Sequence, residues 1–154
     1  MSFKIEIGNL FTNVEHGLIM HGCNAQGAMG AGVAAIIRNK YPLAYEKYAE
    51  QNPNYILGEV IPVIVEENLV IVNAITQEYF GTDRVRADYD AIEQACKGAV
   101  HLATSGLIES TDIHLPLIGG GLAGGDALRL LDIFEAVFTD AEPDTTLWLL
   151  ENVK

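Results

Sequence analysis

Two glycine-rich loops carry the clearest chemical signal in this sequence. The first covers residues 21–32 (HGCNAQGAMGAG) and follows the apolar run 18–20, and the second covers residues 116–126 (PLIGGGLAGGD) and follows 113–115. Glycine lets backbone N–H groups turn toward a ligand, and it lets the ligand approach without meeting a Cβ. A loop that opens a helix adds the partial positive charge of the helix N-terminus. Two such loops in a chain of 154 residues predict that the fold brings them together around a pyrophosphate.

The glycine patterns exclude two familiar phosphate-binding motifs. Neither loop continues into the Lys-Ser or Lys-Thr pair of a P-loop. The spacing in Gly27-Ala28-Met29-Gly30-Ala31-Gly32 differs from the dinucleotide fingerprint, and no acidic residue stands at the usual later position. Kinase and dehydrogenase functions are therefore disfavoured. The alternative for the loops themselves is that they are ordinary strand-to-helix turns that require a positive φ.

Composition and charge restrict the class of protein. Apolar residues make up 49% of the chain and charged residues 19%, which predicts one globular domain over residues 1–154. A net charge of −12 disfavours tracking along nucleic acid or binding to an anionic membrane. The two cysteines match no disulfide scaffold or metal motif, and no apolar run is long enough for a membrane span. We expect a reduced, cytoplasmic protein with no metal and no cofactor.

Short strands and helices alternate along the chain and would position the loops. Strands are predicted at 3–7, 17–20, 59–65, 69–72, 113–116 and 146–150, and helices from 33 to before Pro42, over 42–51, over 89–105 and from 127 onward. The pair 59–65 and 69–72 is expected to form a hairpin through Glu66-Glu67-Asn68. The pattern predicts a three-layer α/β/α domain with a central mixed sheet of about six strands, whose ligands bind beyond the strand carboxyl ends.

Several motifs together resemble the ADP-ribose-binding macrodomain family. They are GNLF at 8–11, HGCNAQ at 21–26, MGAGVA at 29–34, YDA at 89–91 and IGGGLAGGD at 118–126, with Gln77, Tyr79 and Gly81 between them. The similarity is greatest to small members that act as ADP-ribose 1''-phosphate phosphatases or remove ADP-ribose from carboxylate side chains. The resemblance covers the chain from Gly8 to about Trp148 and implies a macrodomain-like fold with an ADP-ribose cleft.

The resemblance also implies a set of ligand contacts. Asn9 stands where the family usually has an aspartate that reads adenine, and Asn24 stands where a polar side chain holds the distal ribose. The implied binding residues are Gly8, Asn9, Leu10, Asn24, Gly30, Ala31, Gly32, Val33, Gln77, Gly119, Gly120, Gly121, Leu122 and Ala123. The expected partner is ADP-ribose, a derivative substituted at the distal ribose, or an ADP-ribosylated protein. Asn9 could instead only shape a turn.

Two residues are implied as catalytic. His21 matches a histidine that phosphatase-like members place at the mouth of the distal ribose pocket, where it would act as a general acid or base. Asp126 follows the second loop and would flank the distal C1'' opposite His21, with a water between them. The alternatives are that His21 is a structural histidine and that Asp126 only caps a helix.

The sequence leaves two classes of function open. One is an enzyme that hydrolyses a substituent at the distal ribose C1'', foremost the phosphate of ADP-ribose 1''-phosphate. The other is a module that only binds ADP-ribose. Gln77 and Ala123 stand where the carboxylate-ester hydrolases have a lysine and an aspartate, which argues against that third activity.

Overall fold

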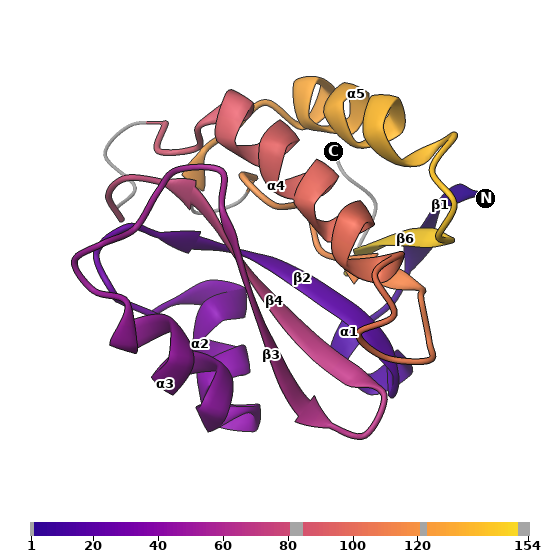
Figure 1. Ribbon diagram of the computed structural model, residues 1–154. Helices are drawn as coiled ribbons and strands as arrows, with labels where there is room; N and C mark the ends of the chain where they lie inside the picture. Colours follow the sequence, from indigo (N-terminus) through magenta and orange to yellow (C-terminus); the bar gives the residue numbers. More distant parts are fainter. Residues whose placement is uncertain (1, 81–84, 121–122, 151–154) are drawn as a thin grey trace.

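A six-stranded mixed sheet forms the centre of the molecule in the computed structural model, which describes residues 2–80, 85–120 and 123–150 (Figure 1). The strands lie in the order β1-β6-β5-β2-β4-β3. Their bounds are β1 Phe3–Ile7, β2 Gly17–Asn24, β3 Val60–Glu66, β4 Leu69–Gln77, β5 Ile113–Leu115 and β6 Thr145–Leu149. The expected three-layer α/β/α class and the mixed sheet are confirmed.

All paired strands are parallel except β3, which runs antiparallel to β4. The predicted hairpin is therefore confirmed, with Val63 opposite Ile71 in its register. Asn68 adopts a φ of 62° in the connecting turn, a conformation that asparagine tolerates better than most residues. β1 lies at the other edge of the sheet, as its alternating apolar and polar residues indicate.

The helices form two layers, one on each face of the sheet (Figure 1). α4 (Tyr89–Ala103) and α5 (Ala127–Phe138) cover one face, and α2 (Gly32–Lys40) and α3 (Pro42–Glu50) cover the other. Because successive strand residues point to opposite faces, Leu18 and Met20 pack with α4 and α5, whereas Ile19 packs with α2 and α3. No helix among the described residues is long and apolar enough to cross a membrane.

One helix has no counterpart among the sequence predictions. α1 (Leu10–Asn13) is a single turn after β1, and the Asn9 side chain caps it by accepting a hydrogen bond from the Phe11 amide at 2.9 Å. A single turn contains too few residues for an apolar repeat to reveal it. The other helices begin within two residues of their predicted starts, where Pro42 and the Asp88 and Asp126 caps stand. The three of them with a predicted end, α2, α3 and α4, also end within two residues of it.

Candidate functional site

The two glycine loops leave the sheet from neighbouring strands. β2 and β5 are adjacent and parallel, so their carboxyl ends lie at the same edge of the sheet. The chain after β2 enters α2 on one face, and the chain after β5 enters α5 on the opposite face (Figure 1). The two connections diverge from this point, and such a topological switch point opens the crevice in which α/β proteins bind ligands.

Direct packing joins the second loop to the strand that carries the first. A Cβ added at Gly22 of β2 would lie 2.7 Å from Thr76 Oγ1 and 3.0 Å from Ile118 Cγ2. Glycine is therefore required at position 22 for β4 and the start of the second loop to approach this closely. The predicted juxtaposition of the two loops is confirmed at this contact.

The Asn24 side chain folds the first loop. Its Oδ1 accepts hydrogen bonds from the Gln26 amide at 3.0 Å and the Ala28 amide at 3.3 Å, and its Nδ2 donates to the Ala28 carbonyl at 2.9 Å. The side chain is almost completely buried. An amide NH₂ carries two hydrogens, and these bonds use one of them. The predicted contact between Asn24 and a ribose hydroxyl stays a prediction, for which the second N–H is the available donor.

Tyr48 of α3 anchors this loop, and the sequence analysis missed it. Its hydroxyl lies 2.6 Å from the Asn24 carbonyl oxygen and 2.9 Å from Asn24 Oδ1, and it donates its proton to this pair of acceptors. Tyr55 stacks on the Tyr48 ring at 5.0 Å and donates its own hydroxyl to the Tyr48 carbonyl at 2.7 Å. Burial raises the pKa of the Tyr48 phenol, so it remains a protonated donor. The available signal was a tyrosine on the apolar face of a helix, since a buried hydroxyl needs a partner.

The first loop ends in a helix start that no side chain caps. Among the described residues around this start, the N-cap Ala31 makes no side-chain hydrogen bond to α2, whereas Asp88 and Asp126 cap α4 and α5. Gly30, Ala31 and Gly32 are exposed there, and Val33 is half-buried. The first amides of a helix lack partners within the helix, so an anion can satisfy them and gain from the helix dipole.

Close packing at its glycines shapes the second loop. Gly119 has a φ of 84°, and a Cβ there would lie 2.7 Å from Ile92 Cδ1. A Cβ at Gly125 would overlap the Gly119 carbonyl oxygen, and a Cβ at Gly120 would lie 2.8 Å from Leu117 Cδ2. The Ala123 carbonyl accepts hydrogen bonds from the Arg86 and Ala87 amides at 2.8 and 3.3 Å. The predicted contacts at Gly121 and Leu122 fall outside the described residues.

The structure corrects the predicted position of His21. The side chain is fully buried in β2, and its ring Nε2–H donates to Asn73 Oδ1 at 2.6 Å. Asn73 in turn donates to the Ala44 carbonyl of α3 at 3.1 Å, which places this network on the face covered by α2 and α3. Burial lowers the pKa of His21 to about 4. The residue is therefore a neutral, internal histidine and does not line the mouth of a pocket.

Asp126 lies apart from His21. It is exposed at the N-terminus of α5, where its Oδ1 accepts the Leu128 amide at 3.0 Å, and its own amide donates to the Tyr89 hydroxyl at 3.0 Å. α5 covers the face opposite to the one that His21 faces. The expectation that His21 and Asp126 flank one site is therefore wrong, because the pleat of β2 turns His21 away from α5.

The buried thiol beside His21 adds no reactive group. Cys23 Sγ lies 3.6 Å from His21 Nε2, and burial raises the pKa of the thiol. A low histidine pKa combined with a high thiol pKa keeps both groups neutral. The pair therefore fills the interior below the first loop and does not form a thiolate–imidazolium nucleophile.

The remaining predicted contacts lie at the same edge of the sheet. Gln77 ends β4 next to Asn24 of β2, and its Nε2 donates to the Tyr79 carbonyl at 2.7 Å. At the other end of this carboxyl edge, after β1, the Gly8 amide donates a hydrogen bond to the Leu149 carbonyl, and Asn9 caps α1. Leu10 opens α1 and its side chain is buried in the core, so its predicted ligand contact, which stays a prediction, would come from its backbone. The binding roles of Gly8, Asn9 and Gln77 stay predictions.

Comparison with known proteins identifies the family. No family model matches the chain. An ADP-ribose 1''-phosphate phosphatase from Meyerozyma guilliermondii is 31% identical, and the alignment covers 75% of this chain and 82% of that protein. The chain belongs to the macrodomain family.

Solved structures agree with this assignment. A protein of unknown function from Bacteroides thetaiotaomicron superimposes on this macrodomain with a TM-score of 0.85 at 26% identity, covering 97% of this chain and 99% of that one. A macrodomain protein from Streptomyces coelicolor gives a TM-score of 0.75 at 24% identity, covering 96% and 97%. The resemblance noted in the sequence and the macrodomain-like fold are therefore confirmed.

Proposed function

We propose that this macrodomain binds ADP-ribose in the crevice between the two glycine loops and hydrolyses ADP-ribose 1''-phosphate. The observation that carries the binding proposal is the topology. Two glycine loops leave adjacent parallel strands at the switch point of the sheet, and the first ends in the uncapped start of α2. The name of the M. guilliermondii relative supports the reaction.

Neutral backbone donors hold the pyrophosphate in this proposal. The chain carries 21 acidic residues against nine lysines and arginines, so its overall field repels an anion. Amides at the start of α2 and in the second loop can still bind the pyrophosphate, because they donate hydrogen bonds at short range and need no charged side chain. The ligand would lie along the carboxyl edge from Asn24 at the distal ribose to Asn9 at the adenine.

In this reaction a water molecule hydrolyses the phosphate ester at the distal C1'' and yields ADP-ribose and inorganic phosphate. Because His21 is internal and neutral, we assign the acid–base function to Asp126 alone among the two candidates. Asp126 Oδ1 is used by the helix cap, and its carboxylate has a second oxygen that can accept a proton from an attacking water. Such assistance is worth roughly 10²–10⁴ in rate.

Phosphate release from ADP-ribose 1''-phosphate tests the proposal, together with calorimetry of free ADP-ribose. The wild type should release phosphate and bind ADP-ribose, and Asp126→Asn should lose turnover while it keeps the helix cap and the affinity for ADP-ribose. Binding without phosphate release would identify a module that only recognises ADP-ribose. An ADP-ribosylated glutamate substrate belongs in the same panel, and we expect no cleavage because Gln77 and Ala123 replace the lysine and aspartate.

A further inference from the structure

A pocket of about 370 Å³ lies outside the two glycine loops, between the end of β4 and the starts of α4 and α5. Leu57 and Glu78 form one side of it, and the segment from Arg86 to Asp90 forms another. Arg129, from the first turn of α5, completes the wall. Neither Arg86 nor Arg129 belongs to one of the motifs in the sequence.

Hydrogen bonds connect this pocket to the second glycine loop. The Arg86 and Ala87 amides both donate to the Ala123 carbonyl, and the Tyr89 hydroxyl accepts from the Asp126 amide. The pocket wall and the loop are thus parts of one bonded unit. A substituent on the ligand end held beside Ala123 and Asp126 would extend toward this pocket.

Arg129 is held in place at the pocket. Its guanidinium group lies 3.8 Å from the centroid of the Tyr89 ring, and a stacked guanidinium keeps its edge N–H donors available for a planar or tetrahedral anion. Two arginines line this one pocket in a chain with nine basic residues in total. Arginine is the side chain best suited to phosphate oxygens, because it donates two parallel hydrogen bonds.

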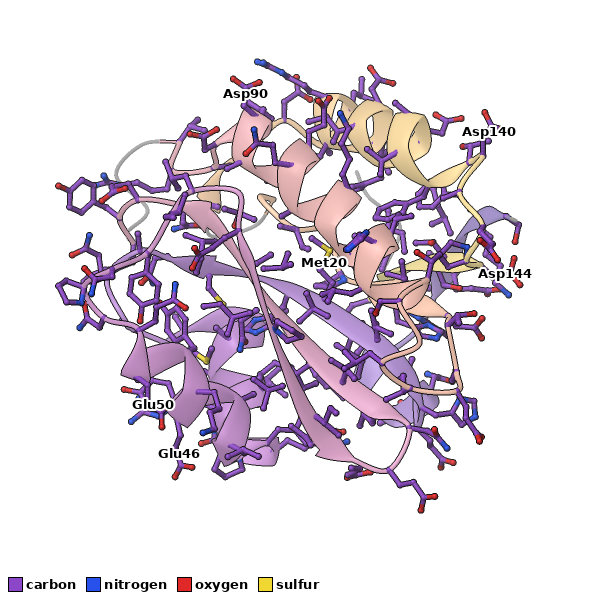
Figure 2. All side chains as sticks on the ribbon, viewed as in Figure 1. Met20, Glu46, Glu50, Asp90, Asp140 and Asp144 are labelled. Atoms are coloured by element: carbon purple, nitrogen blue, oxygen red, sulfur yellow. The ribbon has the colours of Figure 1, made fainter. Side chains whose placement is uncertain are left out.

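Three acidic residues also face the pocket, and their positions limit their effect. The Asp88 carboxylate caps α4 by accepting the Ala91 amide at 3.0 Å. Glu78 and Asp90 are exposed, and Asp90 extends outward from the first turn of α4 (Figure 2). Arg129 is exposed as well, so water and salt screen all of these charges. What distinguishes Arg129 is its stack on Tyr89, which fixes the position of the guanidinium group.

We propose that this pocket is the subsite for the 1''-phosphate, with Arg129 as the group that recognises it. The inference rests on the proposed function and adds the origin of its substrate specificity. The glycine loops bind the ADP-ribose moiety, and the arginine pocket distinguishes the phosphorylated substrate from the product.

The test is Arg129→Gln, with Arg38→Gln as a matched control. Arg38 of α2 stacks over Tyr45 at 4.0 Å, so its replacement removes the same charge and the same kind of stack away from the pocket. We expect Arg129→Gln to raise the KM for ADP-ribose 1''-phosphate about tenfold, the effect of losing one charge-assisted contact. The Kd for ADP-ribose should stay within about twofold of wild type, because the loops supply that affinity.

Equal KM values in Arg129→Gln and Arg38→Gln would overturn the inference. A wild type that binds ADP-ribose but releases no phosphate would contradict the proposed reaction and leave the pocket testable. In that case ADP-ribose 1''-phosphate is not hydrolysed during the titration, so calorimetry can measure the ratio of its Kd to the Kd of ADP-ribose. A ratio that Arg129→Gln does not change would then reject the phosphate subsite.

Discussion

The two glycine loops are built in different ways, although both serve the same crevice. Side chains from outside the first loop hold it in place: Tyr48 of α3 bonds Asn24, and Tyr55 supports Tyr48. Close packing at its own glycines shapes the second loop: a Cβ at Gly125 would overlap the Gly119 carbonyl oxygen, and a Cβ at Gly119 would lie 2.7 Å from Ile92 Cδ1. The first loop is therefore sensitive to distant polar groups, and the second is sensitive to the size of its own residues.

Replacing a glycine should have its largest effect in the second loop. A Cβ at Gly125 would overlap the Gly119 carbonyl, and backbone cannot rotate away as a side chain can. We expect Gly125→Ala to lower the free energy of unfolding by about 3 kcal/mol. Gly30→Ala is the control in the first loop, because a Cβ there meets open space. Similar denaturation midpoints for the two variants would contradict the difference between the loops.

The polar network below the first loop should make stability depend on pH. The pKa of His21 is about 4 in the folded protein, because of burial, against 6.5 when unfolded. Above pH 6.5 the residue is neutral in both states. As the pH falls from 6.5 to 4, the unfolded chain binds a proton that the folded chain excludes, so stability decreases. The loss between pH 7 and 5 should be about 2 kcal/mol.

Urea denaturation at several pH values measures this loss in the wild type and in His21→Gln. The glutamine variant has no imidazole and should show a flatter profile. His114, whose pKa burial also lowers, contributes in the same direction in both proteins and cancels in the comparison. Identical profiles would mean that His21 is not the titrating group.

Removing the Tyr48 hydroxyl tests whether side chains position the first loop. Tyr48→Phe should lower the free energy of unfolding by roughly 1–2 kcal/mol, because it removes a buried hydrogen bond. It should also raise the Kd for ADP-ribose about tenfold, since Asn24 loses its anchor. Tyr55→Phe removes a bond to the Tyr48 carbonyl and leaves the loop bonds intact. A Kd that rises equally in both variants would show a general loss of stability and not a positioning effect.

The smallest expected effect is the response of binding to salt. Both loops offer amides and no lysine or arginine, so few counterions are displaced on binding. The Kd for ADP-ribose should rise by less than about threefold for a tenfold increase in salt. Calorimetry at two salt concentrations measures this. A steep dependence would mean that charged side chains hold the pyrophosphate.

The sequence by itself determined the three-layer α/β/α class with a mixed sheet, the β3–β4 hairpin and the two glycine loops. These features depend on local chemistry: alternating apolar residues, the Asn68 turn, Pro42 and the glycine runs. Local patterns also indicated that Asp126 could cap α5, which the structure confirms. The roles of Gly8, Asn9 and Gln77 in binding are still predictions.

Only the tertiary structure decided which face each side chain occupies and what it meets there. His21 belongs to a motif that suggests an active site, yet the pleat of β2 turns it toward Asn73 and α3. Tyr48 and Arg129 show no motif, because their partners Asn24 and Tyr89 lie 24 and 40 positions away in sequence and meet them only in the fold. Burial, hydrogen-bond partners and pockets arise from contacts between distant segments, and local residue patterns do not predict those contacts.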